Sequence, residues 1–169
     1  MTYFIWLLRI VHIGAGAFWF GGVMMMAFFI APTVREMGDA GPKFVAYLVR
    51  NLKFTTRMMA AAGLTVLAGF ILYWIDSHGF SSNWMRSGAG TGFGIGAVFG
   101  AVAFTYGILV GRTTNALVNL GGQTQGKPSP EQLTQLQTLQ QRQGSYTRIT
   151  AYALILSVIF MSIARYFVF

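Results

Sequence analysis

The feature that most constrains the fold is a set of four long apolar segments in a chain of 169 residues. They cover residues 4–31, 54–75, 91–111 and 149–168. A helix of about 20 residues crosses the roughly 30 Å hydrocarbon core of a bilayer. Charged residues make up only 9% of the chain, and no polar stretch is long enough to bury a core of its own. The sequence therefore predicts one domain, residues 1–169, that forms an all-α, four-helix transmembrane bundle.

The distribution of charge predicts the topology of the spans. The net charge is +8, but the basic residues flank the apolar segments instead of covering one face, so we expect the lipid bilayer and not nucleic acid as the partner. Under the positive-inside rule, the basic first and third connections lie in the cytoplasm and both termini lie outside. We expect a multi-pass protein of the inner, cytoplasmic membrane. The basic residues of these connections are Arg35, Lys43, Arg50, Lys53, Arg57, Arg112, Lys127, Arg142 and Arg148.

Several kinds of chemistry are excluded by composition. Cysteine is absent, which rules out disulfides, thiolate metal sites and thiol nucleophiles. The only carboxylates are Glu36, Asp39, Asp76 and Glu131, and none falls in a span, so no carboxylate can relay protons through the membrane. No serine has a nearby base. The sequence does not predict a catalytic site.

The connections have helical signals of their own. Phe44 and Leu48 belong to an apolar pattern that predicts a short amphipathic helix before the second span. Residues 121–126 have the composition of a flexible loop. Ser129 then fits an N-cap, followed by Pro130 and the capping-box partner Gln132. This pattern predicts a separate helix over about 130–143 that ends near Gly144 and either lies on the cytoplasmic surface or docks a partner.

One histidine, His12, lies well inside the first span, with Arg9 one helical turn earlier. Ionisable groups at that depth are costly and are usually functional. Glycines recur in the spans, mostly four residues apart in span three, and they include Gly16, Gly96 and Gly100. Small residues allow close helix packing. They also leave room for a flat prosthetic group, and the sequence leaves both interpretations open.

Counting depth at 1.5 Å per residue places His12 level with three other segments: 65–69 in span two, 96–100 in span three and 157–161 in span four. This arrangement predicts a haem b site. The alternative is a hydrogen bond from His12 to a serine, a threonine or a backbone carbonyl of another helix. The haem hypothesis assigns His12 as axial ligand, Met161 as the second ligand, Arg9 and Arg165 to the propionates, and Gly16, Gly96 and Gly100 as the residues that make room.

Methionines form a second candidate site. Residues 24–26 end span one, and Met58 and Met59 begin span two at a similar depth. Thioethers bind Cu(I), so this hairpin predicts a copper site, although methionine also fills irregular apolar gaps. The other histidine, His78, falls beyond span two, too far in depth to ligate one iron together with His12.

The opening pattern VHIGAGAFWFGG, residues 11–22, resembles the first helix of CopD-like copper-resistance membrane proteins and of related four-helix proteins, including the TMEM205-like group. Pro32 and the segment 161–166 are also similar to that group. The resemblance implies His12 and Trp19 as family-matching positions, and copper or haem handling as the activity. Three functions are therefore expected as alternatives: a haem b protein in electron transfer with a membrane redox partner, a copper-handling protein, and a cofactor-free subunit that packs against partner helices.

Overall fold

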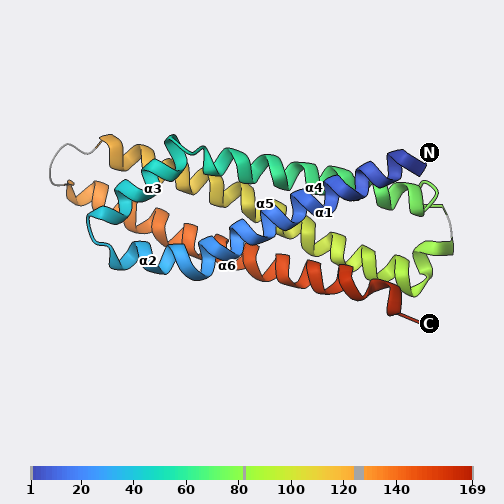
Figure 1. The fold of residues 1–169 in the computed structure, drawn as a ribbon. Coiled ribbons are helices and arrows are strands. Elements are labelled where there is room, and N and C mark those ends of the chain that lie inside the picture. The colour runs from blue at the N-terminus through green and yellow to red at the C-terminus, as the bar shows by residue number, and fades with distance from the viewer. Residues whose placement is uncertain (1, 82, 124–127, 169) are drawn as a thin grey trace.

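The computed structural model describes residues 2–81, 83–123 and 128–168. Within these ranges the chain is helical apart from short connections and contains no strand (Figure 1). The predicted all-α membrane protein with four spans is confirmed. The helical segments that are long and apolar enough to cross a membrane are Thr2–Glu36, Phe54–Asp76, Gly88–Gln123 and Pro130–Tyr166.

The first span continues past its proline. Helix α1 (Thr2–Met25) leads through a π-helical turn, η1 (Met26–Ile30), into α2 (Ala31–Glu36). At the end of η1 the Ala31 N–H donates to the Met26 carbonyl, five residues back. Pro32 has no N–H, and its ring crowds the preceding turn, so a wider turn accommodates it. The helix therefore does not stop at residue 31, as predicted, but at Glu36.

Helices α2 and α3 (Ala40–Arg50) form a short hairpin. Gly38 has a φ of +53° at the turn, a left-handed conformation that glycine adopts at little cost. Gly41 lies so close to the Val34 carbonyl that a Cβ would overlap its oxygen. The short helix predicted around Phe44 is confirmed in α3, and close approach of its backbone to α2 depends on a glycine.

Helix α4 (Phe54–Asp76) ends in a turn built on Ser77, whose hydroxyl donates to the Trp74 carbonyl at 3.2 Å and accepts from the Phe80 N–H at 3.1 Å. A 3-10 turn, η2 (Asn83–Arg86), follows and leads into α5 (Gly88–Gln123). These turns make the α4–α5 connection compact.

The two longest helices are α5, with 36 residues, and α6 (Pro130–Ile163), with 34. The predicted capping box at the start of α6 is confirmed. Gly121 and Gly122 are helical rather than part of the predicted loop, whose residues 124–126 lie outside the described ranges. The predicted end of a separate helix near Gly144 is wrong, because α6 packs against α5 and runs unbroken through that glycine. A 3-10 turn, η3 (Ala164–Tyr166), completes the chain's last helical segment.

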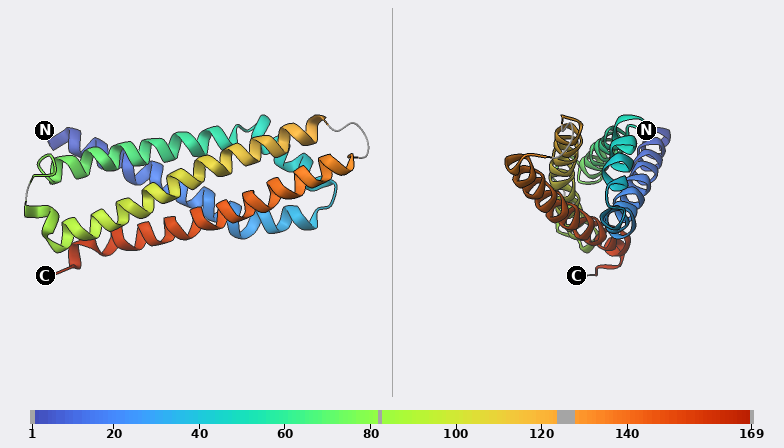
Figure 2. Two further views of the ribbon diagram at one scale, coloured as in Figure 1. Left: turned by 180° about the vertical axis from the view of Figure 1, so that it is seen from behind. Right: turned by 90° about the vertical axis from the view of Figure 1, so that its left-hand side faces the viewer.

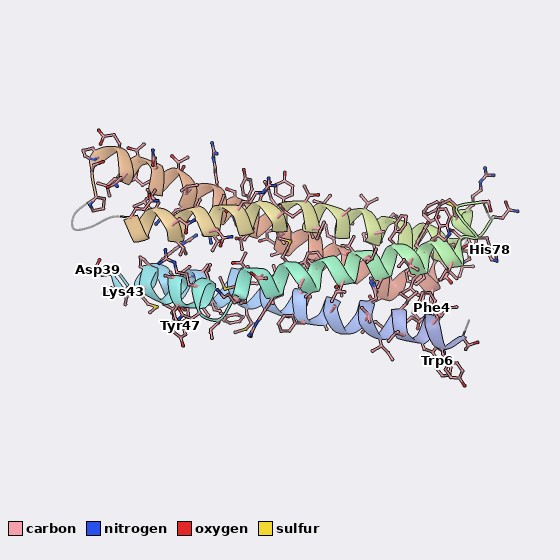
Figure 3. All side chains as sticks on the ribbon, turned by 90° about the horizontal axis from the view of Figure 1, so that it is seen from above. Phe4, Trp6, Asp39, Lys43, Tyr47 and His78 are labelled. Atoms are coloured by element: carbon pink, nitrogen blue, oxygen red, sulfur yellow. The ribbon has the colours of Figure 1, made fainter. Side chains whose placement is uncertain are left out.

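The helices associate as two pairs, α1 with α4 and α5 with α6. Helix α1 crosses the bundle diagonally, starting beside α4 and reaching α6 near η1 (Figure 1). Both termini lie at the same end of the bundle (Figure 2), which we call the termini end. The opposite end, which holds α2 and α3, is the hairpin end. Figure 3 shows Trp6 and His78 at the termini end, and Asp39 and Lys43 at the hairpin end.

Gly96 and Gly100, in the glycine stripe of α5, lie against side chains of the last span. A Cβ on Gly96 would lie 2.9 Å from Met161 Cγ, and one on Gly100 would lie 3.4 Å from Ser157 Oγ. The Ser157 hydroxyl also donates to the Gly96 carbonyl at 2.8 Å. This part of the stripe therefore serves close packing of α5 against α6.

Candidate functional site

The imidazole of His12 lies in the contact between α1 and α4. Its Nδ1 is 2.8 Å from the Thr65 carbonyl oxygen, close enough for an Nδ1–H donor bond. A Cβ on Gly69 would lie 2.6 Å from His12 Cε1, so the ring occupies a niche that only glycine leaves open. The depth count that placed His12 level with residues 65–69 is confirmed, and so is the alternative of a bond from His12 to a backbone carbonyl.

The other residues of the predicted haem site lie in different surroundings. Gly16 faces Thr65, whose Cγ2 would be 3.3 Å from a Cβ on that glycine. Met161 packs into the Gly96 niche between α5 and α6. Arg9 and Arg165 are exposed. The set is thus divided between the two helix pairs.

The predicted haem residues do not lie around a common space. A porphyrin needs an open slot, but Met161 and Ser157 fill the space beside Gly96 and Gly100. His12 alone has the orientation of a metal ligand, since an imidazole held through Nδ1–H presents Nε2. The seven residues do not form one haem pocket, and among the described residues no three His, Asp or Glu side chains form a metal-binding group.

A cavity of about 90 Å³ lies instead toward the hairpin end, between the two helix pairs. All four spans and α3 contribute to its walls. By the same measure one water needs roughly 10–15 Å³, and an engineered cavity of about 150 Å³ binds benzene. This cavity has room for a segment of a hydrocarbon chain but not for a porphyrin.

The cavity walls are mostly apolar and partly deformable. Trp19 is only 4% exposed and packs edge-on against Phe104, with ring centroids 6.5 Å apart. Three methionines, Met26, Met58 and Met59, line the cavity, and flexible thioether side chains can repack around a larger guest. Met26 belongs to the π-helical turn η1, so the turn that accommodates Pro32 also shapes this wall.

Polar groups line the cavity on α5 and α6. The Gln143 amide donates to the Thr114 hydroxyl at 3.3 Å, which joins the two helices. Thr150 is 2% exposed, and its hydroxyl donates to the Tyr146 carbonyl at 2.8 Å. The residues that line the cavity include hydroxyls and one amide but no carboxylate, imidazole or amine. The site is therefore suited to binding and not to acid–base catalysis.

Two arginines of the α2–α3 hairpin lie beside glycines of the long helices. Arg50 Nη2 donates to the Val118 carbonyl at 2.9 Å and would be 2.6 Å from a Cβ on Gly122. Arg35 Nη2 would be 3.5 Å from a Cβ on Gly144. Sequence reasoning missed these contacts, because it placed both glycines in or next to loops. The sequence did contain an indication of these contacts. Both glycines fall within long helical patterns, where glycine lowers helix stability and is expected mainly where close packing requires it.

The termini end carries an aromatic cluster around the α4–α5 connection. Trp74 and Phe80 pack edge-on with ring centroids 4.9 Å apart, and Trp84 stacks on Phe93. The Tyr73 hydroxyl donates to the Gly90 carbonyl at 3.2 Å and ties the end of α4 to the start of α5. Trp and Tyr are typical of membrane–water interfaces, so this cluster is consistent with anchoring of the bundle.

Compared with protein-family models, with curated proteins and with solved structures, the chain matches none. The resemblance to CopD-like proteins therefore stays a prediction.

Proposed function

We propose that this protein is a lipid-binding protein of the membrane, and that its ligand places a hydrocarbon chain in the cavity beside Trp19. The observation that carries the proposal is the apolar cavity lined by residues of all four spans, with hydroxyl and amide groups on α5 and α6. Ligand sites are typically apolar pockets with a few polar groups that orient the ligand.

The position of the cavity supports a ligand that arrives from the bilayer. The cavity lies between the α1–α4 pair and the α5–α6 pair, toward one end of the spans. Hydrocarbon chains are the most abundant apolar groups at that depth. The methionines Met58 and Met59 let the wall adapt to a flexible chain.

Trp19 offers a direct test, because it lines the cavity and is almost fully buried. A variant that keeps Trp19 and replaces the other three tryptophans by phenylalanine is reconstituted in vesicles of phosphatidylcholine with dibrominated acyl chains. Bromine quenches tryptophan on contact, so we expect strong quenching of Trp19. Fluorescence equal to that in unbrominated vesicles would refute the proposal.

Haem binding through His12 stays a second candidate. Its support is the Nδ1 contact with the Thr65 carbonyl, which orients the ring as in metal-bound histidines. Electron transfer would follow only from bound haem. An absorption spectrum of purified protein tests this: a Soret band that His12→Ala removes would favour haem, and a colourless protein that stays colourless after haem supplementation would exclude it.

Copper handling is the third candidate. Its support is that Met26, Met58 and Met59 line one cavity, which brings together the two methionine groups of the predicted hairpin. Thioethers suit Cu(I). Metal analysis after anaerobic addition of Cu(I) tests it. Stoichiometric copper that is lost in Met58→Leu would favour this function over lipid binding.

We further propose that the hairpin end faces the cytoplasm of a bacterial-type inner membrane. The support is the excess of Lys and Arg in the first and third connections, both at that end. The structural-subunit alternative has less support, because α6 already covers Gly96 and Gly100 of the α5 glycine stripe that was expected to pack against partner helices.

A further inference from the structure

Building on the proposed lipid site, we propose that the ligand is an anionic phospholipid whose head group is bound by Arg35 and Arg50 of the α2–α3 hairpin. The cavity holds part of an acyl chain, and the two guanidinium groups bind the phosphate at its rim.

The Arg50 guanidinium is held in place by one hydrogen bond, and its other donors are not used by that bond. It directly follows the cavity-lining residue Val49, and its guanidinium contacts the Val118 carbonyl, one turn beyond the cavity-lining Thr114. A guanidinium has five N–H donors, and the contact with Val118 uses one of its two terminal nitrogens. The remaining donors of this exposed side chain are available to a phosphate.

Arg35, on the other helix of the hairpin, lies against α6 beside the cavity. It is one turn beyond Ala31, and it lies beside Gly144, the neighbour of Gln143; both Ala31 and Gln143 line the cavity. Two cations from one hairpin thus lie near cavity-lining residues, Arg50 against α5 and Arg35 against α6. Because each lies against a glycine, the long helices add no side chain that would push the guanidinium away.

The charge around these arginines favours an anion. In the described part of the chain neither arginine pairs with a carboxylate, although Glu36 and Asp39 are on the same hairpin. Arginine binds phosphate through parallel N–H donors. A soluble anion would leave the apolar cavity without a ligand, whereas a phospholipid satisfies both the cavity and its charged rim.

The test compares two head groups in the Trp19-only protein. Vesicles of unbrominated phosphatidylcholine receive a minor fraction of dibrominated phosphatidylglycerol or of dibrominated phosphatidylcholine. We expect stronger quenching by phosphatidylglycerol. Arg35→Gln and Arg50→Gln should each reduce the ratio of the two apparent affinities by about fivefold, the effect of losing one direct hydrogen bond to the phosphate.

The matched control is Arg142→Gln, an exposed arginine of α6 close to Gly144 that leaves both rim arginines in place. It should leave the ratio unchanged. The ratio is the decisive readout, because loosening of α3 would change quenching by both lipids together. Thermal unfolding in detergent verifies that each variant is folded.

Equal quenching by both lipids, unaffected by either arginine variant, would overturn this inference and leave lipid binding intact. No quenching by either lipid would overturn both proposals. Quenching by dibrominated stearate that depends on the arginines, without quenching by phosphatidylglycerol, would assign the site to a fatty acid and refute the phospholipid.

Discussion

At the scale of single residues, the glycines differ in purpose, and the structure separates those that receive a neighbour from those that face open space. Gly69 receives the His12 ring, whereas a Cβ on Gly63, on the same helix, would meet no atom within 4 Å. From the sequence alone, the roles of Gly63 and Gly69 cannot be distinguished.

We expect Gly69→Ala to destabilise the protein by about 1–3 kcal/mol, because its methyl group would overlap the His12 ring and force it out of its niche. Gly63→Ala is the matched control and should be neutral or stabilising by up to about 1 kcal/mol through helix propensity. Thermal unfolding in detergent measures both. Equal effects of the two substitutions would contradict the described packing of His12.

The level of His12 could be predicted because a straight helix rises a fixed distance per residue, and counting from the membrane surface found residues 65–69. The cavity could not be predicted in this way. It depends on the angle at which α1 crosses from α4 to α6, and on the π-helical turn at Met26, neither of which follows from hydropathy.

At the scale of elements, α3 is secured by a side chain and not by a long interface. Arg50 bonds to α5 at Val118, next to Gly122. Sequence patterns predicted the existence of α3 and the start of α6. They did not predict that α6 continues through Gly144, because continuity there comes from packing against α5.

Gly122→Leu should therefore loosen α3. A side chain at this position would displace the Arg50 guanidinium and break its bond to the Val118 carbonyl, and we expect about fivefold faster amide exchange in α3 for the loss of about 1 kcal/mol. Gly121→Leu is the control, since a Cβ there meets no atom within 4 Å. Exchange in α3 that is as slow in Gly122→Leu as in the control would argue against the role of Arg50.

The first turn of α6 allows a test of the cap. The Ser129 hydroxyl donates to Glu131 Oε2 at 2.7 Å, and this bond lowers the pKa of Glu131 below its ordinary 4.5. A carboxylate whose pKa is lowered by folding stabilises the folded state at pH values above its ordinary pKa. This contribution is lost as the pH falls through the lowered pKa.

Ser129→Ala should return the pKa of Glu131 toward its ordinary value and cost about 1 kcal/mol of helix stability through loss of the cap. An NMR titration of Glu131 and amide exchange of residues 131–134 measure the two effects. An unchanged pKa in the variant would show that the Ser129 hydroxyl does not bind this carboxylate.

At the scale of the whole molecule, the fold places both termini and the α4–α5 connection at one end, and the basic hairpin at the other (Figure 2). The sequence predicted this arrangement because successive connections between four spans must lie at alternate ends of the bundle. The sidedness comes from the charge bias alone.

Cysteine labelling tests the sidedness, and the native chain has no cysteine to interfere. In cells, an impermeant thiol reagent should modify Asn83→Cys, which is exposed at the termini end, and should spare Gln137→Cys, which is exposed on α6. The reverse pattern would place the arginine rim outside the cell and overturn the proposed orientation.

The most direct test of lipid binding measures Trp19 quenching in a variant whose cavity is filled by a new side chain. Gly107 lines it, and a Cβ there meets no atom within 4 Å, so Gly107→Leu occupies the cavity without a clash at its first carbon. Gly14→Leu, at an exposed position of α1 with equally open space, is the control. In dibrominated phosphatidylcholine, the Trp19-only protein with Gly107→Leu should lose most of its quenching, whereas Gly14→Leu should retain it. Quenching that persists unchanged in Gly107→Leu would show that the chain contacting Trp19 does not lie in this cavity and would contradict the proposed function.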